Sequence, residues 1–171
     1  AGVTVGLALQ GGLANLAGGV LLLLFKPFVV GDYIIQDQSN GCEGTVAKIE
    51  ICYTTLLSID NKKIVVPNGT LSNSTIINVT AKENRKLEIK VGISYEADIQ
   101  KAKRIIEKIL REDADTKSDT KEMVVFVDEL ADSAVIMGLR VWVSTERYWP
   151  TKWRLNQKIK EEFDANGIVI P

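Results

Sequence analysis

The stretch that decides the fold is AGVTVGLALQGGLANLAGGVLLLLF, residues 1–25, in which no side chain carries a charge. As a helix this stretch would be about 37 Å long, whereas the hydrocarbon core of a bilayer is about 30 Å thick. All 21 basic and 22 acidic residues of the 171-residue chain follow it. The sequence therefore predicts one membrane-spanning helix and a longer water-soluble part, with a buried helix of a soluble protein as the alternative.

Small residues are frequent in this stretch, which includes six glycines: Gly2, Gly6, Gly11, Gly12, Gly18 and Gly19. Glycine disfavours an isolated helix in water. In lipid, however, small residues let helices approach closely, and Gly2-x-x-x-Gly6 has the spacing found at such contacts. A helix with small residues on two flanks can pack against identical copies on both sides. We therefore expect several copies of the chain to form a ring.

Val3 and Leu7 lie four residues apart and share one helix face. In a ring this face would form successive apolar collars, which can block ions by dewetting without a charged plug. The alternative, that this face contacts lipid, stays open because periodicity does not separate the two. The glycine pairs at 11–12 and 18–19 are candidate bending points, and Pro27 predicts the end of the helix.

Residues 29–81 predict a small all-β domain. Its β-rich runs cover residues 33–35, 44–51, 54–59 and 63–66. Asp60 and Asn61 predict the tip of a hairpin between the last two runs. The spacing of these short runs indicates a small barrel.

Residues 82–171 predict an α+β domain. Apolar and charged residues alternate over 86–93, which indicates a half-buried strand, and Asp98 is placed to cap a following amphipathic helix. Strands are expected over 123–127 and 135–143. Pro150 fits the first turn of a second helix, with Gly167 as its stop. We expect the inward residues of this helix to be Trp153, Ile159 and Phe163. A last strand over 168–170 would complete the ferredoxin-like order βαββαβ.

Composition argues against several function classes. The formal net charge is −1, without the basic excess of nucleic-acid-binding proteins. There is no histidine, which removes the usual general base and metal ligand. No phosphate-binding glycine loop or dinucleotide fingerprint occurs. We therefore expect no enzyme activity, no cofactor, no metal and no nucleic-acid partner.

The remaining candidate motifs favour structural interpretations. Cys42 and Cys52 would lie roughly 33 Å apart on one strand, far beyond disulfide distance, so we expect reduced packing residues. An acidic loop with Asp113, Asp115 and Asp119 fails the calcium-loop pattern. Three glycosylation sequons, at Asn68, Asn73 and Asn78, are interpreted as turn and edge residues. An aromatic group, Tyr148, Trp149 and Trp153, is interpreted as packing in the core or between subunits.

The chain resembles the mechanosensitive channels of small conductance. The resemblance rests on motifs in the family's order along the whole chain: Gly6-Leu-Ala-Leu-Gln-Gly11, Leu13-Ala-Asn15-Leu, Gly19-Val-Leu-Leu, Phe25-Lys-Pro-Phe28, Gly31-Asp-Tyr-Ile, Gly44-Thr-Val, Val66-Pro-Asn-Gly69, Val91-Gly-Ile-Ser-Tyr95, Arg140-Val-Trp142 and Phe163-Asp-Ala-Asn-Gly-Ile168. It implies a pore-lining transmembrane helix with an amphipathic second half over 1–28, an Sm-like β domain over 29–81 and a ferredoxin-like domain over 82–171. The family's upstream transmembrane helices are not in the sequence, so we expect it to be a piece of a longer protein.

The resemblance also implies roles for single residues. Val3 and Leu7 match the pore constriction. Gly11 matches the helix kink and Gly19 a second hinge, while Gly12 and Gly18 stand where the family often has serine and alanine and add flexibility. Leu9 and Leu13 match positions facing the outer, tension-sensing helices. Coupling to the cytoplasmic body falls to Asn15 and to a turn formed by Asn68 and Gly69.

The expected function is a mechanosensitive ion channel of a bacterial-type inner membrane. The resemblance implies a homoheptamer, gated by membrane tension through a hydrophobic ring, that releases ions and small osmolytes on hypoosmotic shock. The soluble domains would be cytoplasmic, and the full-length protein would cross the membrane several times. The alternative is a membrane-anchored cytoplasmic module that binds RNA or a small metabolite.

Overall fold

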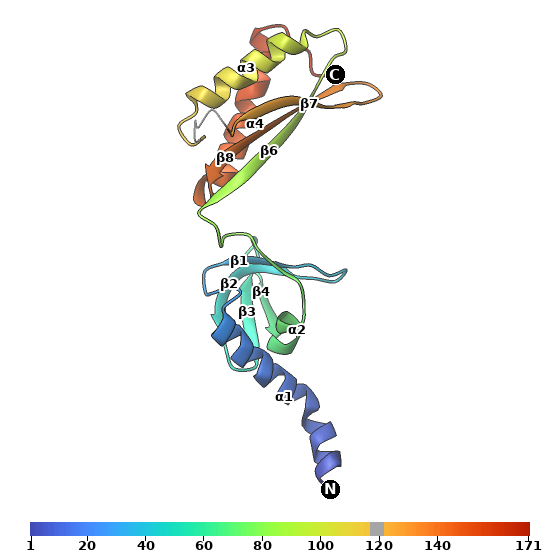
Figure 1. Cartoon of the computed structure of the whole chain (residues 1–171), viewed down its shortest axis with the longest axis vertical. Helices are drawn as coiled ribbons and strands as arrows, with labels where there is room; N and C mark the ends of the chain where they lie inside the picture. The colour runs from blue at the N-terminus through green and yellow to red at the C-terminus, as the bar shows by residue number, and fades with distance from the viewer. Residues whose placement is uncertain (117–121) are drawn as a thin grey trace. The chain divides into compact units, whose positions relative to one another are not determined.

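The computed structural model describes residues 1–116 and 122–171. The chain divides into two compact units, Ala1–Ala81 and Lys82–Pro171. Figure 1 shows one long helix, a small sheet and a short helix in the first unit, and a sheet with two longer helices in the second. Each unit has its own apolar core.

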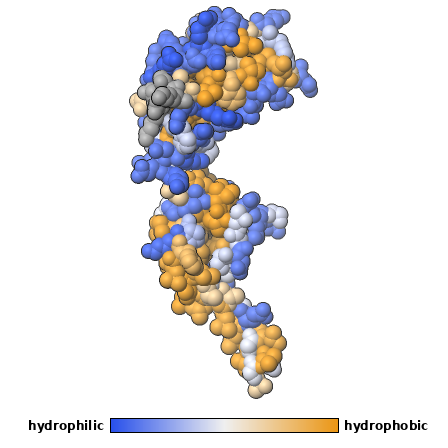
Figure 2. Space-filling model, in the orientation of Figure 1, coloured by the Kyte–Doolittle hydropathy of each residue, from blue (hydrophilic) through white to orange (hydrophobic). Residues whose placement is uncertain are grey.

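The first element is α1 (Gly2–Phe25), one continuous helix. Within the chain only Gly18, Gly19 and Leu22 of this helix are buried, and Figure 2 shows its apolar residues at the surface. The helix is long and apolar enough to span a membrane. It ends at Lys26, which adopts the left-handed conformation with a φ of 46° and donates its backbone N–H to Leu22. Pro27 follows and cannot continue the helix.

The first unit also contains five strands and one short helix. They are β1 (Tyr33–Gln36), β2 (Glu43–Ile49), β3 (Tyr53–Leu57), β4 (Lys63–Pro67), α2 (Asn68–Ser72) and β5 (Ile76–Asn78). The sheet order is β4-β3-β2-β1-β5, with every neighbouring pair antiparallel. Leu22 of α1 packs with Leu56 and Leu71 in the core of this unit, so the end of α1 belongs to it.

The hairpin predicted at Asp60 and Asn61 is confirmed. These residues connect β3 to β4, and Asn61 has a φ of 63°, which asparagine tolerates better than most residues. The turn expected at Asn68 and Gly69 is the first turn of a short helix, α2. The chain reverses after β4 through this helix, which places Leu71 in the core.

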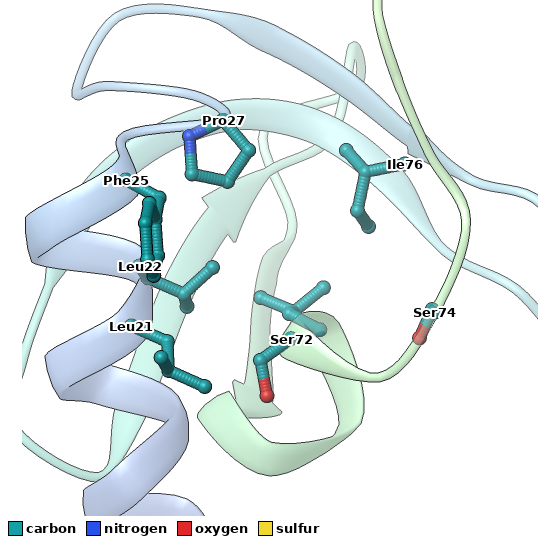
Figure 3. Close-up of a pocket in the computed structure, with 8 residues that line it drawn as sticks. Leu21, Leu22, Phe25, Pro27, Ser72, Ser74 and Ile76 are labelled. Carbon is teal, nitrogen blue, oxygen red and sulfur yellow. The ribbon is translucent and has the colours of Figure 1, made fainter.

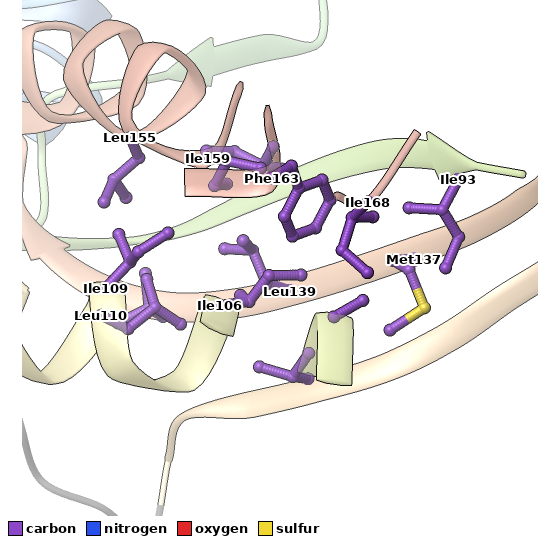
Figure 4. Packing of buried hydrophobic residues seen from close by; sticks show 14 of the residues in the cluster. Ile93, Ile106, Ile109, Leu110, Met137, Leu139, Leu155, Ile159, Phe163 and Ile168 are labelled. Carbon is purple, nitrogen blue, oxygen red and sulfur yellow. The ribbon is translucent and has the colours of Figure 1, made fainter. Parts of the chain in front are cut away.

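The second unit combines three strands with two helices. They are β6 (Asn84–Ile93), α3 (Ile99–Glu112), β7 (Val124–Leu130), β8 (Val135–Ser144) and α4 (Tyr148–Ala165), with a short 3-10 turn, Thr145–Arg147, before α4. The antiparallel sheet has the order β6-β8-β7. Figure 4 shows residues of both helices, among them Ile106 and Phe163, packing with Leu139 of β8. As predicted, Asp98 caps α3 by accepting hydrogen bonds from the backbone N–H groups of Gln100 and Lys101.

The last strand predicted for residues 168–170 is wrong, since no strand is formed there. The segment does approach the end of β6, where the backbone N–H of Ser94 donates to the carbonyl of Val169 at 2.9 Å. A ladder needs repeated hydrogen bonds along both strands, and this contact does not extend into one. Ile168 nevertheless contributes to the core.

The inward position predicted for Trp153 is also wrong, because this side chain is 63% exposed. The buried residues of α4 are Thr151, Leu155, Ile159 and Phe163, at four-residue spacing. Trp153 lies two residues from both Thr151 and Leu155, on the opposite side of the helix. Trp149 is exposed as well. Core packing within the chain is thus excluded for these two tryptophans, whereas packing between subunits stays a prediction.

Candidate functional site

The first half of α1 presents its side chains away from the rest of the chain. Four expected site residues lie here, all more than half exposed: Val3, Leu7, Leu9 and Leu13. The same half contains four glycines, Gly2, Gly6, Gly11 and Gly12, and no described atom outside the helix lies within 4 Å of the position a Cβ would take on any of them. The helix continues through Gly11 and Gly12, so bending there stays a prediction.

The second half of α1 packs closely on α2 and on the chain between β2 and β3. A Cβ on Gly18 would lie 2.6 Å from the backbone C and O atoms of Asn68. A Cβ on Gly19 would lie 2.1 Å from the carbonyl oxygen of Ile51. The structure therefore requires glycine at both positions for close backbone approach, whether or not either one also bends.

Asn68 organises the surface on which α1 packs. Its fully buried side chain accepts a hydrogen bond from Oγ1 of Thr54 and donates from Nδ2 to the carbonyl of Glu50, both at 2.7 Å. Its backbone N–H donates to Cys52 at 2.9 Å. These bonds fix the start of α2 against β3, because a buried amide is costly unless its polar atoms are paired.

Asn15 completes this contact from the helix side. Its Oδ1 accepts a hydrogen bond from the backbone N–H of Gly69 at 3.1 Å. A Cβ on Gly69 would lie 2.9 Å from the same oxygen, so the absence of a side chain lets Asn15 reach the α2 backbone. The structure thus brings Asn15 together with Asn68 and Gly69, and leaves Val3 and Leu7 apart from them.

The sequence did not identify two members of this contact, Thr54 and Ile51. Thr54 looks like an ordinary strand residue, and only the pairing of β3 with β4 places it under Asn68. Ile51 takes part through its carbonyl oxygen, which no side-chain motif can reveal.

An apolar groove opens at the far end of the second half of α1 (Figure 3). Its volume is about 360 Å³. It is lined by Leu21, Leu22, Phe25, Pro27, Leu71, Ser72, Ser74 and Ile76. The lining contains no titratable group, so the groove suits apolar packing rather than acid–base chemistry.

The acidic residues after α3 serve an ion-pair cluster. Arg154 of α4 donates to both carboxylate oxygens of Asp113, at 2.7 and 2.8 Å, and to Asp115 at 2.9 Å. Arg147 also binds Asp115. Burial would raise the pKa of Asp113, but hydrogen bonds from Arg154 and the backbone hold that pKa below its usual value. Asp119 lies outside the described residues.

This cluster ties the end of α3 to α4 and pairs the two described carboxylates of the acidic loop, Asp113 and Asp115, with arginine. Among residues 1–116 and 122–171, no group of three potential metal ligands lies close enough together to hold a metal ion.

Comparison with known proteins gives the family. The family model "Mechanosensitive ion channel, beta-domain" matches residues 12–81, and "Mechanosensitive ion channel MscS, C-terminal" matches residues 87–170. The small-conductance mechanosensitive channel of Edwardsiella ictaluri (strain 93-146) is 40% identical over 171 residues, which are 100% of this chain and 58% of the relative. The corresponding channel of Helicobacter pylori (strain UM084) is 33% identical over 173 residues, covering 99% of this chain and 61% of the relative.

A solved structure agrees with these matches. The crystal structure of Helicobacter pylori MscS in the closed state has a TM-score of 0.88 and 31% identity, covering 99% of this chain and 66% of that one. The chain thus spans about three fifths of the length of the curated relatives it matches. Since two models of one family together match most of its residues, the chain belongs to the MscS family of mechanosensitive ion channels.

Proposed function

We propose that α1 lines the pore of a channel gated by membrane tension, which releases ions and small osmolytes on hypoosmotic shock. The observation that carries this proposal is the first half of α1. Its apolar side chains and its glycines find no partner within the described chain, although the sequence and solved-structure relatives are named as mechanosensitive channels. Partners outside the chain, namely other copies and lipid, account for such a surface.

The gate is formed by rings of Val3 and Leu7. The two residues are 78% and 68% exposed in the single chain and lie about 6 Å apart along the helix axis. In a ring they make two stacked apolar collars, which exclude water when narrow and conduct when the helices tilt apart.

The assembly is a homoheptamer in a bacterial-type inner membrane, with both folded units on the cytoplasmic side. Gly2 and Gly6 allow neighbouring copies of α1 to approach closely. The full-length protein crosses the membrane several times, and its outer helices contact Leu9 and Leu13. The five-stranded sheet of the first unit is Sm-like. The second unit follows the ferredoxin-like order except for its last strand, since its elements run βαββα.

Coupling between the pore and the folded units passes through Asn15, Asn68 and Gly69. The hydrogen bond from Gly69 to Asn15 and the close contacts of Gly18 and Gly19 support this role. Bending at Gly11 and Gly12 lets the first half of α1 move while the second half keeps these contacts. Gly18 and Gly19 are the second proposed hinge, and bending there would change these contacts.

The test is Leu7→Ser in the full-length protein, recorded in membrane patches under graded tension. A ring of hydroxyl groups hydrates more readily than a ring of leucine side chains, so the channel should open at lower tension. Leu24→Ser is the matched control, because Leu24 is similarly exposed but lies outside the proposed collars. Equal tension dependence of Leu7→Ser and the parent would remove Leu7 from the gate. Salt-sensitive RNA binding without any tension-activated current would favour the binding-module alternative.

A further inference from the structure

A second hydrogen-bonded cluster lies where the chain leaves α1, away from Asn15 and Asn68. Its centre is the half-buried carboxylate of Asp32. One oxygen, Oδ2, accepts from the backbone N–H of Val29 and from Nδ2 of Asn78, both at 2.9 Å. The other, Oδ1, accepts from Oγ1 of Thr80 at 3.4 Å. The carboxylate thus joins the connection after α1 to the end of β5.

The partners of Asp32 are themselves held in place. Nδ2 of Asn78 also donates to the carbonyl of Pro27 at 3.1 Å. Oγ1 of Thr80 accepts from the backbone N–H of Tyr33 at 2.9 Å. One amide group of β5 therefore binds both ends of the segment from Pro27 to Asp32, which separates α1 from β1.

Asn78 and Thr80 belong to one of the sequons that the sequence analysis set aside as edge residues. The structure gives them a definite contact, because both polar side chains are used within the first unit. Hydrogen bonds to a carboxylate are stronger than those between neutral groups. Because Asp32 carries a charge, its hydrogen bonds hold the connection after α1 more strongly than bonds between neutral turn residues would.

We propose that Asp32 and Asn78 are positioning residues that fasten the C-terminal end of the pore helix to β5. This inference rests on the proposed channel function. It adds a contact beyond the end of α1, which lies about 15 Å along the helix from Asn15, to the close packing of Gly18, Gly19 and Leu22 in the second half. A helix that is also fastened beyond its last residue must carry the first unit with it or strain these contacts when it tilts. The cluster therefore resists tilting of α1 and raises the tension needed for opening.

The experiment uses the full-length channel in membrane patches, with Asp32→Asn, Asn78→Asp and the double variant. Asp32→Asn keeps the shape but loses the charge and turns an acceptor into a donor. Asn78→Asp places two carboxylates in contact. The double variant again pairs one amide with one carboxylate, so it should recover part of the attachment.

Each single variant should raise the ratio of open to closed channels at a fixed tension about tenfold, the effect of losing one strong hydrogen bond. The double variant should return this ratio to within about threefold of the parent. Asp37→Asn and Asn73→Asp are the matched controls, because both residues are exposed and neither contacts the cluster. They should leave the ratio unchanged.

Thermal unfolding of the assembled protein separates gating from folding. The proposal requires a gating shift larger than the matched controls give, in protein that still assembles. Unchanged gating in both single variants, or a double variant worse than either, overturns it while leaving the pore function intact. If the parent and the exposed controls pass no tension-activated current, the channel function itself fails.

If both single variants fail to assemble, the Thr80→Val variant tests the effect of the Asp32 cluster on gating in their place. It removes the longest bond to Asp32 together with the bond that Thr80 accepts from the backbone N–H of Tyr33, and it should raise the ratio about threefold. A ratio equal to the parent's would then overturn the proposal.

Discussion

The two halves of α1 contain glycine for different reasons. In the first half, Gly11 and Gly12 are surrounded by open space. In the second half, Gly18 and Gly19 lie so close to other backbone that a methyl group would overlap it. Contacts within the chain therefore explain the glycines of the second half of α1. They do not explain the glycines of the first half.

This difference shows where the partners of α1 are. The second half already has its partners, α2 and the chain between β2 and β3, in the same unit. The first half exposes Val3 and Leu7, and an apolar helix face without a partner in its own chain indicates contacts with other molecules. Substitutions that act on one half only can test this division.

The largest effect is expected for Gly19→Ala. Its Cβ would lie 2.1 Å from the carbonyl oxygen of Ile51, so either α1 or the β2–β3 connection must shift. Overpacking of this kind costs about 1–3 kcal/mol and sometimes more. Hydrogen exchange in detergent should show faster exchange of the amides of α2 and β3.

Gly11→Ala provides the contrast. It meets no neighbouring atom within the chain, and replacing a helical glycine by alanine stabilises the helix by about 1 kcal/mol. Exchange in α2 and β3 should be unchanged, while assembly of the full-length protein is affected if this face packs against other copies. Equal exchange of α2 in both variants would contradict the division of α1 into two halves.

The next effect is expected for Asn68→Ala. It removes a buried amide and leaves Oγ1 of Thr54 and the carbonyl of Glu50 without their partner. Only the Thr54 hydroxyl is fully buried, and a buried polar group left unsatisfied costs about 1–3 kcal/mol. The free energy of unfolding of the first unit should fall by about that amount, as followed by hydrogen exchange of its strands.

Asn15→Ala should cost less, about 1 kcal/mol, because it removes one hydrogen bond from a half-buried side chain. It nevertheless breaks the contact between helix and body. A cost equal to that of Asn68→Ala would mean that Asn15 supports the fold of the unit and not only the position of α1.

Much of this arrangement could be predicted from local sequence signals. Charge-free residues 1–25, the Asp60–Asn61 hairpin and the Asp98 cap each depend on neighbouring residues, and the structure has a helix, a turn and a cap at these places. The position of Asn68 near Asn15 came from a family resemblance and not from spacing. The roles of these residues stay predictions, because a single chain does not contain the ring in which they act.

The failures of prediction arise from tertiary structure. Trp153 looked like an inward residue because it is large and apolar, but the inward face of α4 is set by Leu155 and Ile159. Residues 168–170 have strand-like composition but do not pair repeatedly. The Asp32 cluster was not predicted, because its members are separated by 46 and 48 positions.

A smaller effect is expected when acidification protonates Asp113 in the second unit; α1 itself contains no titratable side chain. The pKa of Asp113 is lowered in the folded state, so its contribution is present above its unfolded value of about 4 and is lost as pH falls through the folded pKa. Because Arg154 is partly exposed, this contribution is about 1 kcal/mol or less. Tryptophan fluorescence should report unfolding of the second unit at a lower temperature below about pH 4, and Asp113→Asn should reduce that pH dependence.

The smallest effect is expected at Lys26, where the packed half of α1 ends. Its φ of 46° places a non-glycine residue in the left-handed region, which costs about 1 kcal/mol and which glycine adopts freely. Lys26→Gly should therefore stabilise the first unit by less than about 1 kcal/mol, since the unfolded chain also gains freedom. Lys26→Gln keeps the backbone strain and removes the charge, so it separates the two contributions. The backbone N–H at position 26 donates to the carbonyl of Leu22. Hydrogen exchange of this amide should slow in Lys26→Gly and stay unchanged in Lys26→Gln. If both variants slow it equally, the charge and not the backbone conformation limits the stability of this helix end.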